Sequence, residues 1–362
     1  MASAATSTAA PAVGRFPEFP ELDGFRGLAL LLVLLEHTLR WSLQISGPWT
    51  HWGSAGVILF FSLSGFLITG LLCAERTRTG RVDLRAFWVR RGLRIVPAMV
   101  VFVAVAALLK LAGLFGVKPY WRDFPVTLLC LRNLAGDGAE LQHLWSVSLE
   151  QQFYVFWPLL FAWLPFPRAR QAGWVLFLGV IAWRTAAILT GLYGWDSTPI
   201  YQRTDFRLDA MMGGCLIALA WHQGRLSTAW LRWASPLWVL PALLAWAGWG
   251  SQVPGGQVTF ITGQVLLALL LLARLVVAPT DAFAGFCRCG WLRWLGRRSY
   301  SIYLWQQLFL AAKTPDWGWV RVFPADVLFA FAAGLASYHF VELPCLRLKS
   351  RWGGRPVTPP AR

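Results

Sequence analysis

Charged side chains are scarce in this sequence. Only 14% of its 362 residues are Asp, Glu, Lys or Arg, whereas about 25% is usual in a soluble domain. Acidic residues are scarcest, with 17 Asp and Glu against 33 Lys and Arg and a net charge of +16. A nucleic-acid-binding protein carries such an excess on a polar surface, but 57% of this chain is hydrophobic. The composition therefore argues against a nucleic-acid partner and indicates a protein that folds in a lipid bilayer.

Two further shortages narrow the class. Six cysteines in 362 residues are too few for a disulfide framework, and Cys287 and Cys289 have no partner ligands nearby, so we predict no metal site. The first 20 residues lack the basic and apolar regions of a secretory signal. We expect residues 1–20 to be a disordered cytoplasmic tail, residues 21–345 a membrane domain, and residues 346–362 a basic cytoplasmic tail.

Long apolar runs fill the rest of the chain. A spanning helix needs about 20 mostly apolar residues. Ten segments are candidates: Leu22–Leu43, Gly53–Ala74, Ile95–Gly116, Leu144–Leu164, Trp174–Tyr193, Arg207–His222, Pro236–Gly250, Val258–Val277, Ser299–Ala312 and Ala325–Glu342. The segment Phe124–Leu134 is too short to span and is expected to lie at an interface or to re-enter. The sequence predicts an all-α, polytopic membrane protein with about ten transmembrane helices in one bundle.

The distribution of basic residues predicts the orientation of these helices. With a cytoplasmic N-terminus, 21 of the 33 Lys and Arg fall in the inner segments, and an excess of Lys and Arg marks the cytoplasmic side. The outer segments hold far fewer, among them Lys118, Arg122, Arg132, Arg203 and Arg321. We therefore expect a multi-pass membrane protein with both termini in the cytoplasm.

Two ionisable residues of the first span, Arg26 and His37, are predicted to share a face. They are 11 residues apart, which at about 100° per residue is about 20° beyond three full turns, and about 16 Å along the axis. An anion at Arg26 would extend a long arm toward His37. The alternative is that Arg26 snorkels to the interface and His37 bonds a neighbouring helix. Glu36 points about 100° away from His37 and is not expected to be its partner.

Other polar residues allow both a structural and a functional interpretation. Ser64 and Gly65 permit close helix packing. Four basic residues stand just before the third span: Arg85, Arg90, Arg91 and Arg94. They either follow the positive-inside rule or form a phosphate site. Arg suits the second role because it contacts phosphate in bidentate fashion. Glu150 is either an ion-pair partner or part of a site. We expect Lys110, Arg184 and Arg274 to snorkel or to pair.

Seven segments, in this order, match the motifs of one known family. They are Leu22–Ala29 followed by His37, Phe60–Leu67, Phe87–Pro97, Trp145–Tyr154, Arg207–Asp209, Ser299–Trp305 and Glu342–Pro344. From Leu22 to Pro344 the chain resembles acyltransferase family 3, the integral-membrane O-acyltransferases of bacterial surface sugars. Two positions depart from the family pattern: Gln151 replaces a second acid, and Gln306 stands where the family often has His. Some members carry an added soluble hydrolase-like domain, which we do not expect here.

The resemblance implies transfer of an acyl group, commonly acetyl, from cytoplasmic acyl-coenzyme A to a hydroxyl of a carbohydrate or glycolipid. Acyl-coenzyme A would be a co-substrate, with no permanently bound cofactor. Its phosphates would contact Arg26 and Arg90, Arg91 or Arg94. His37 would be the general base, because a neutral imidazole accepts a proton at neutral pH, and an acyl-His route remains open.

The remaining candidates have supporting roles in this hypothesis. Glu150 would orient His37 or the acceptor, and Ser64, Ser299 or Tyr303 would bond the oxyanion. The further substrate-site candidates are Asp23, Arg207, Asp209 and Glu342. A transporter or flippase for an anionic sugar or lipid is the competing function, and a membrane scaffold is a third that leaves Arg26, His37 and Glu150 unexplained. The sequence leaves the acceptor, the acyl length and the oligomeric state open.

Overall fold

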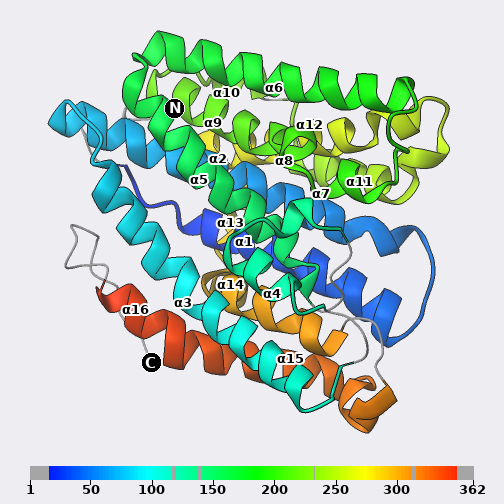
Figure 1. Ribbon diagram of the computed structural model, residues 1–362. Coiled ribbons are helices and arrows are strands. Elements are labelled where there is room, and N and C mark those ends of the chain that lie inside the picture. Colours follow the sequence, from blue (N-terminus) through cyan, green and yellow to red (C-terminus); the bar gives the residue numbers. More distant parts are fainter. Residues whose placement is uncertain (1–15, 116–119, 137–140, 232, 311–314, 349–362) are drawn as a thin grey trace, which may run out of the picture.

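The described part of the chain is helical. The computed structural model describes residues 16–115, 120–136, 141–231, 233–310 and 315–348 (Figure 1), and no β-strand occurs in these ranges. The α-helices are α1 (Pro20–His37), α2 (Trp52–Thr79), α3 (Leu84–Leu111), α4 (Asp123–Leu128), α5 (Leu144–Trp163), α6 (Phe166–Leu189), α7 (Thr198–Gln202), α8 (Thr204–Arg207), α9 (Asp209–His222), α10 (Thr228–Leu231), α11 (Pro236–Trp249), α12 (Gly256–Val277), α13 (Ala282–Cys287), α14 (Gly290–Leu310), α15 (Ala325–Ser337) and α16 (Leu343–Leu348). Two π-helical turns, Thr38–Ser42 and Tyr338–Glu342, continue α1 and α15. The predicted all-α class is confirmed.

A helix occupies each of the ten predicted spans. Five helical stretches are long and apolar enough to cross a membrane: Trp52–Thr79, Leu84–Leu111, Phe166–Leu189, Gly256–Val277 and Ala325–Leu348. The chain is therefore a polytopic membrane protein, and the count of ten spans stays a prediction. The segment predicted to be too short to span contains α4 and the 3₁₀ turn Arg132–Leu134.

The third helix begins earlier than predicted. Asp83 caps its N-terminus by accepting a hydrogen bond from the Ala86 backbone N–H at 2.9 Å, so that α3 starts at Leu84. The basic segment that we expected to be a loop before the helix is thus part of its first turns. α14 likewise begins at Gly290, nine residues before the predicted start. Basic residues at both positions lowered the apparent hydropathy without ending the helix.

The terminal segments fall largely outside the description. Residues 1–15 and 349–362, most of the two predicted tails, lie outside the described residues. Within the first tail, Phe16 is buried, with its ring against Gly70 and close to the rings of Phe66 and Trp221. Phe16 and Phe19 therefore pack against α2 and α9 at the end of the predicted tail, and the tail itself stays a prediction.

α1 lies in the middle of the helix bundle (Figure 1). It contacts α2 on one side and α14 on the other, α2 packs on α9, and α14 packs on α15. In Figure 1, α6, α9, α11 and α12 gather above α1, and α3, α14 and α15 gather below it. The central position of α1 brings its polar residues into contact with both groups of helices.

Glycines allow two of these helix pairs to meet backbone to backbone. A Cβ at Gly296 of α14 would lie 1.7 Å from the carbonyl oxygen of Asp23 in α1, and a Cβ at Gly65 of α2 would lie 1.9 Å from the carbonyl oxygen of Met211 in α9. Small residues permit such close contact between membrane helices. The predicted role of Gly65 in helix packing is confirmed.

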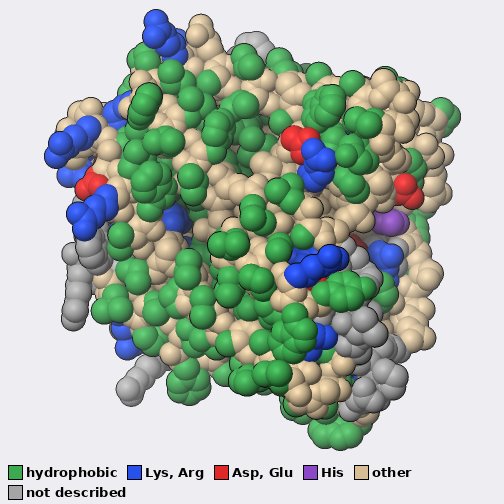
Figure 2. Space-filling model, viewed as in Figure 1, with side chains coloured by type: hydrophobic (Ala, Val, Ile, Leu, Met, Phe, Trp, Pro, Cys, Tyr) green, Lys and Arg blue, Asp and Glu red, His purple; other side chains and the backbone are tan. Residues whose placement is uncertain are grey.

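The outer helices present apolar faces to the surroundings. Of the most apolar stretch of α2, 72% is buried inside the protein, but only 28% of that of α6. Figure 2 shows hydrophobic side chains across most of the face, with several Lys and Arg at its left end and others near its centre and right. A largely apolar surface is expected of a protein surrounded by lipid.

Candidate functional site

A cavity opens between α1, α2, α3, α5 and α14. Its volume is about 90 Å³, which is room for several waters or a small acyl group. The polar residues that line it are Arg26, Ser64, Arg91, Arg94, Ser146, Glu150, Tyr154, Ser299, Tyr300 and Tyr303. The structure thus brings together candidates that are up to 277 positions apart in the sequence.

Three arginines form the boundary between this cavity and a second one. Arg26, Arg91 and Arg94 line both, and the second cavity has a volume of about 300 Å³. Their side chains donate no hydrogen bond to a described residue, and Arg91 lies over the rings of Phe87 and Tyr154 at 5.7 Å. Arg26 and Arg94 are close enough to repel each other. Several guanidinium groups around one opening, without protein acceptors, form a site for an anion.

The second cavity adds one basic and two acidic side chains to this mouth. Arg293 of α14 and Asp23 of α1 line it, as does Glu18. Asp23 therefore lies where the sequence analysis placed it, near Arg26. Arg293 was not among the predicted site residues, and its Nε is buried without a hydrogen bond to a described residue.

Arg90 is not part of this mouth. It lines neither cavity, and its Nη2 lies 3.6 Å from Glu75 Oε2. Because α3 is already helical here, Arg90 points about 100° away from Arg91, whereas Arg91 and Arg94 share a face. Of the three arginines predicted to follow Arg26 into a phosphate site, the structure brings Arg91 and Arg94 to it and leaves Arg90 outside.

Glu150 holds two hydroxyl groups at the inner end of the cavity. Tyr154 donates its hydroxyl hydrogen to Glu150 Oε1 at 2.5 Å, and Ser64 donates to the same oxygen. The Ser64 hydroxyl is thus already used, which removes it from the predicted oxyanion donors in this arrangement. Tyr154 lies one turn after Glu150 on α5 and was not predicted as a site residue.

The two candidates on α14, Tyr303 and Ser299, differ in whether their hydroxyl groups are already hydrogen-bonded. Tyr303 donates its hydroxyl to the carbonyl oxygen of His143 at 2.9 Å and lies 2.7 Å from Ser146 Oγ. Ser299 lines the cavity and makes no side-chain hydrogen bond to a described residue. Ser299 is therefore the hydroxyl among the three predicted donors that is able to bind an incoming oxyanion.

His37 lies beyond the cavity and is bound to Gln306. Its Nδ1 is 2.7 Å from Gln306 Oε1, and His37 is not among the residues that line either cavity. Glu36 accepts a hydrogen bond from the Gly53 N–H at 2.6 Å, at the start of α2, and lies 3.9 Å from Arg40. Glu36 is thus not the partner of His37, as predicted, and Glu150 makes no contact with His37 either.

The seam between α1 and α14 connects the cavity to His37. The two helices meet at Gly27 and Leu292 near their starts and at His37 and Gln306 farther on, so they run in the same direction. Ser299, Tyr303 and Gln306 lie within about 60° of one another around α14, and Gln306 is about 4.5 Å beyond Tyr303 along its axis. His37 therefore lies about one helical turn past the end of the cavity.

Three predicted candidates lie elsewhere. Asp209 pairs with Arg184 at 2.7 Å, and Arg207 is buried beside Trp145, with its guanidinium 5.9 Å from the ring. Glu342 is buried, accepts a hydrogen bond from Ser301 at 2.7 Å, and feels the charges of Arg94 and Arg26. None of these three lines a described cavity. Arg184, and Arg274 with Asp281, are the pairing residues that were predicted.

The site contains groups suited to an anion but none suited to a metal. In the described ranges, no cluster of three or more His, Cys, Asp or Glu could hold a metal ion. The polar groups at the cavity are guanidinium groups, hydroxyl groups and one carboxylate. Guanidinium and hydroxyl groups donate hydrogen bonds, so the set is suited to an anionic ligand.

Comparison with known proteins identifies the family. A family model described as an acyltransferase domain matches residues 19–339. The chain belongs to acyltransferase family 3. The expected resemblance is thereby confirmed over most of the chain, and no solved structure matches it.

Relatives of this acyltransferase chain include three bacterial enzymes. It is 28% identical to the peptidoglycan O-acetyltransferase OatA of Listeria monocytogenes, over 90% of this chain and 55% of the relative. It is 30% identical to the putative peptidoglycan O-acetyltransferase YrhL of Bacillus subtilis, over 90% and 54%. It is 28% identical to the O-acetyltransferase OatA of Staphylococcus aureus, over 90% and 57%. The chain spans about half the length of these curated relatives.

Proposed function

We propose that the protein is a membrane-embedded O-acyltransferase that moves an acyl group, acetyl in the first instance, from cytoplasmic acyl-coenzyme A to a hydroxyl of a cell-surface glycan. Membership of acyltransferase family 3 supports the reaction class. We further propose ten transmembrane helices in the bacterial cytoplasmic membrane with both termini inside. The parallel course of α1 and α14 agrees with this topology, because the first and ninth of ten spans cross in the same direction.

One observation carries the proposal: Arg26, Arg91 and Arg94 stand at the boundary of two cavities, and no described residue accepts a hydrogen bond from their guanidinium groups. Coenzyme A has a phosphate-bearing head and a long, thin arm that ends in the thioester. In our proposal the phosphates bind these arginines and Arg293 in the second cavity. The arm then enters the first cavity beside Glu150 and Tyr154.

We propose that transfer occurs at His37. The arm follows the seam between α1 and α14 past Tyr303, and the thioester reaches the imidazole. His37 Nε2 accepts the proton of the acceptor hydroxyl as its oxygen bonds to the thioester carbon. The C–S bond breaks, and the sulfur takes the proton back from His37. An acyl-His intermediate is the alternative route.

The acceptor proposed here is peptidoglycan or another surface glycan. Two of the compared relatives bear peptidoglycan O-acetyltransferase in their names. In the proposed topology, His37 lies beyond the membrane midplane, which is the side where such a glycan would approach. Lipopolysaccharide, exopolysaccharide and glycolipids present the same hydroxyl chemistry and are the acceptors to compare with peptidoglycan fragments.

The test is acyl transfer by the purified protein in lipid nanodiscs. Acetyl-coenzyme A with a labelled acetyl group is supplied with peptidoglycan fragments, and labelled glycan is measured for the wild type and His37→Ala. We expect His37→Ala to lose activity by about 10²–10⁴-fold, the contribution of a general base. Full activity of His37→Ala would contradict the base assignment. Movement of glycan or lipid across vesicles without acyl transfer would favour the transporter and overturn the enzyme.

A further inference from the structure

We propose that Gln306 is a positioning residue that fixes the proton of His37 on Nδ1 and thereby leaves Nε2 as the basic nitrogen. The inference rests on the proposed function, in which His37 is the general base. Gln306 is one of the two positions at which this chain departs from its family pattern. The contact between Gln306 and His37 joins residues 269 positions apart.

The chemistry of the contact decides the tautomer. Gln306 Oε1 is a carboxamide oxygen, which accepts hydrogen bonds and donates none. At 2.7 Å from this oxygen, Nδ1 must be the donor and must carry the proton. In a neutral imidazole the other nitrogen then has the lone pair. Nε2 makes no hydrogen bond to a described residue, so it is available to accept a proton from a hydroxyl.

The surroundings of Gln306 hold its side chain in place. The residue is fully buried, with 0% of its surface exposed, and it follows Trp305, whose ring packs edge-on against Phe102 at 5.4 Å. It lies on the face of α14 that carries Ser299 and Tyr303 toward the cavity. Its Nε2 is buried without a hydrogen bond to a described residue, so the orientation of the amide rests on the packing around it and on the contact of Oε1 with His37.

The charges around His37 explain the use of an amide. Arg40 lies on the π-helical turn that follows His37. The Glu36 carboxylate is bound to the Gly53 N–H and near Arg40. From α14 the ring meets the neutral Gln306. An uncharged acceptor orients the ring and stabilises the imidazolium form less than a carboxylate at the same place would.

Two substitutions separate orientation from packing. Gln306→Met keeps the length of the side chain and removes the acceptor, and Gln306→Glu keeps an acceptor oxygen in the same place. In nanodiscs with labelled acetyl-coenzyme A, we expect Gln306→Met to lower kcat at least about tenfold, with the donor KM within about twofold. Gln306→Glu should keep a kcat several-fold above that of Gln306→Met. Gel filtration verifies that both variants are folded.

A spectroscopic measurement tests the tautomer without any activity. Wild-type protein with ¹⁵N-labelled histidine is compared by NMR with His37→Ala, which identifies the His37 signals. We expect the shift of a protonated nitrogen at Nδ1 and of an unprotonated nitrogen at Nε2, and loss of this pattern in Gln306→Met. A proton on Nε2 in the wild type would overturn the proposal.

The kinetic outcomes are equally decisive. Wild-type kcat in Gln306→Met, or equal kcat in folded Gln306→Met and Gln306→Glu, would also overturn it. If the wild type transfers no acyl group, the proposed function fails, whereas the NMR result still decides whether Gln306 sets the tautomer. If His37→Ala is inactive but Gln306→Met is not, the base assignment stands and the positioning role falls.

Discussion

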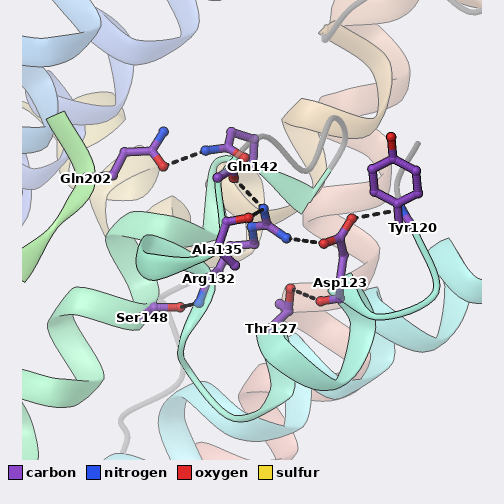
Figure 3. Close-up of polar contacts among 9 residues, drawn as sticks. Tyr120, Asp123, Thr127, Arg132, Ala135, Gln142, Ser148 and Gln202 are labelled. Carbon is purple, nitrogen blue, oxygen red and sulfur yellow. Dashed lines mark hydrogen bonds and ion pairs between the residues drawn. The ribbon is translucent and has the colours of Figure 1, made fainter. Parts of the chain in front are cut away.

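Two polar groups that contain arginine, one around Arg132 and one around Arg26, look alike in the sequence and differ in the structure. Arg132 donates to Asp123 Oδ1 at 2.8 Å and to the carbonyl oxygens of Ala135 and Gly136 (Figure 3). Its backbone N–H donates to Ser148 at 3.2 Å. Arg26, Arg91 and Arg94 make no side-chain hydrogen bond to a described residue. The first group is closed on itself, and the second is open to a ligand.

The closed group has a structural purpose. Asp123 also accepts a hydrogen bond from the Tyr120 N–H at 2.7 Å, so the ion pair joins the start of α4 to the 3₁₀ turn that follows it (Figure 3). Nearby, Asn133, Gln152 and Thr204 bond one another in a ring. A buried charged side chain in a membrane protein therefore indicates function only when some of its hydrogen-bonding groups have no partner in the protein.

Breaking the closed group should have the largest effect on stability. Arg132→Met leaves the Asp123 carboxylate, which is 2% exposed, without its ion-pair partner. Removal of one partner of a buried pair costs about 3–5 kcal/mol. We expect the free energy of unfolding in detergent micelles, measured by thermal or denaturant titration, to fall by that amount.

The matched control for that change is the double variant Arg132→Met with Asp123→Leu. Replacing both partners by apolar side chains removes the uncompensated charge, so part of the lost stability should return. Equal unfolding of Arg132→Met and the wild type would contradict a structural role for the pair.

Breaking the open group should affect binding and spare stability. Arg26→Gln removes a charge that no described acceptor compensates, and a hydrogen bond to a charged group contributes about 1.5–3 kcal/mol to binding. We expect coenzyme A affinity, measured by titration calorimetry, to fall at least about tenfold. The free energy of unfolding should change by less than about 1 kcal/mol.

Arg90→Gln is the matched control for that prediction. Arg90 lies one residue from Arg91 but pairs with Glu75 outside both cavities. The affinity of Arg90→Gln for coenzyme A should stay within about twofold of the wild type, because Arg90 lines neither cavity. Loss of its partly exposed ion pair should lower the free energy of unfolding by only about 0–1 kcal/mol. Equal losses in Arg26→Gln and Arg90→Gln would mean that general positive charge attracts the donor.

The smallest effect is expected at an exposed pair. Arg203 Nη2 lies 2.9 Å from Asp205 Oδ2, at the start of α8, with about a third of each side chain exposed. Burial alone would raise the pKa of Asp205, but hydrogen bonds from Arg203 and Trp183 lower it below the ordinary 3.8. The pair therefore stabilises the fold above pH 3.8, and this contribution is lost as pH falls through the lower, folded-state value.

Asp205→Asn isolates that contribution. The difference in unfolding midpoint between the wild type and this variant should be small at neutral pH and should shrink further toward acid pH. A difference that grows on acidification would contradict the sign of the shift. Comparison of the stability lost in Asp205→Asn with that lost in Arg132→Met measures how much burial changes the contribution of an Arg–Asp ion pair.

The sequence predicts the helices and much of the site because both follow from periodicity. Apolar runs mark the helices, and the 11-residue spacing correctly puts Arg26 and His37 on one face of α1. It does not reveal which face meets which neighbour. The Asp83 cap was the available signal that Arg90 and Arg91 are helical and therefore diverge.

Contacts between distant residues are beyond such reasoning. Gln306 was noted only as a departure from a pattern, and its contact with His37 depends on the crossing of α1 and α14. Arg293 was counted as one of many inner basic residues, and Tyr154 as part of a motif. Nothing in their own segments distinguishes them, because each is brought to its place by the packing of helices that are distant in the sequence.

The backbone contact between α1 and α14 has a mechanical consequence. At Gly27, Gly296 and their partners there is no layer of side chains to slide or change rotamer, so we expect the two helices to move as one piece. The two helices carry the side chains of Arg26, Arg293, Ser299, His37 and Gln306, which would therefore move together. Any widening that admits a bulky donor must then come from α3 and α5, which carry Arg91, Arg94, Glu150 and Tyr154. These two helices would move relative to the pair of α1 and α14, which stays fixed.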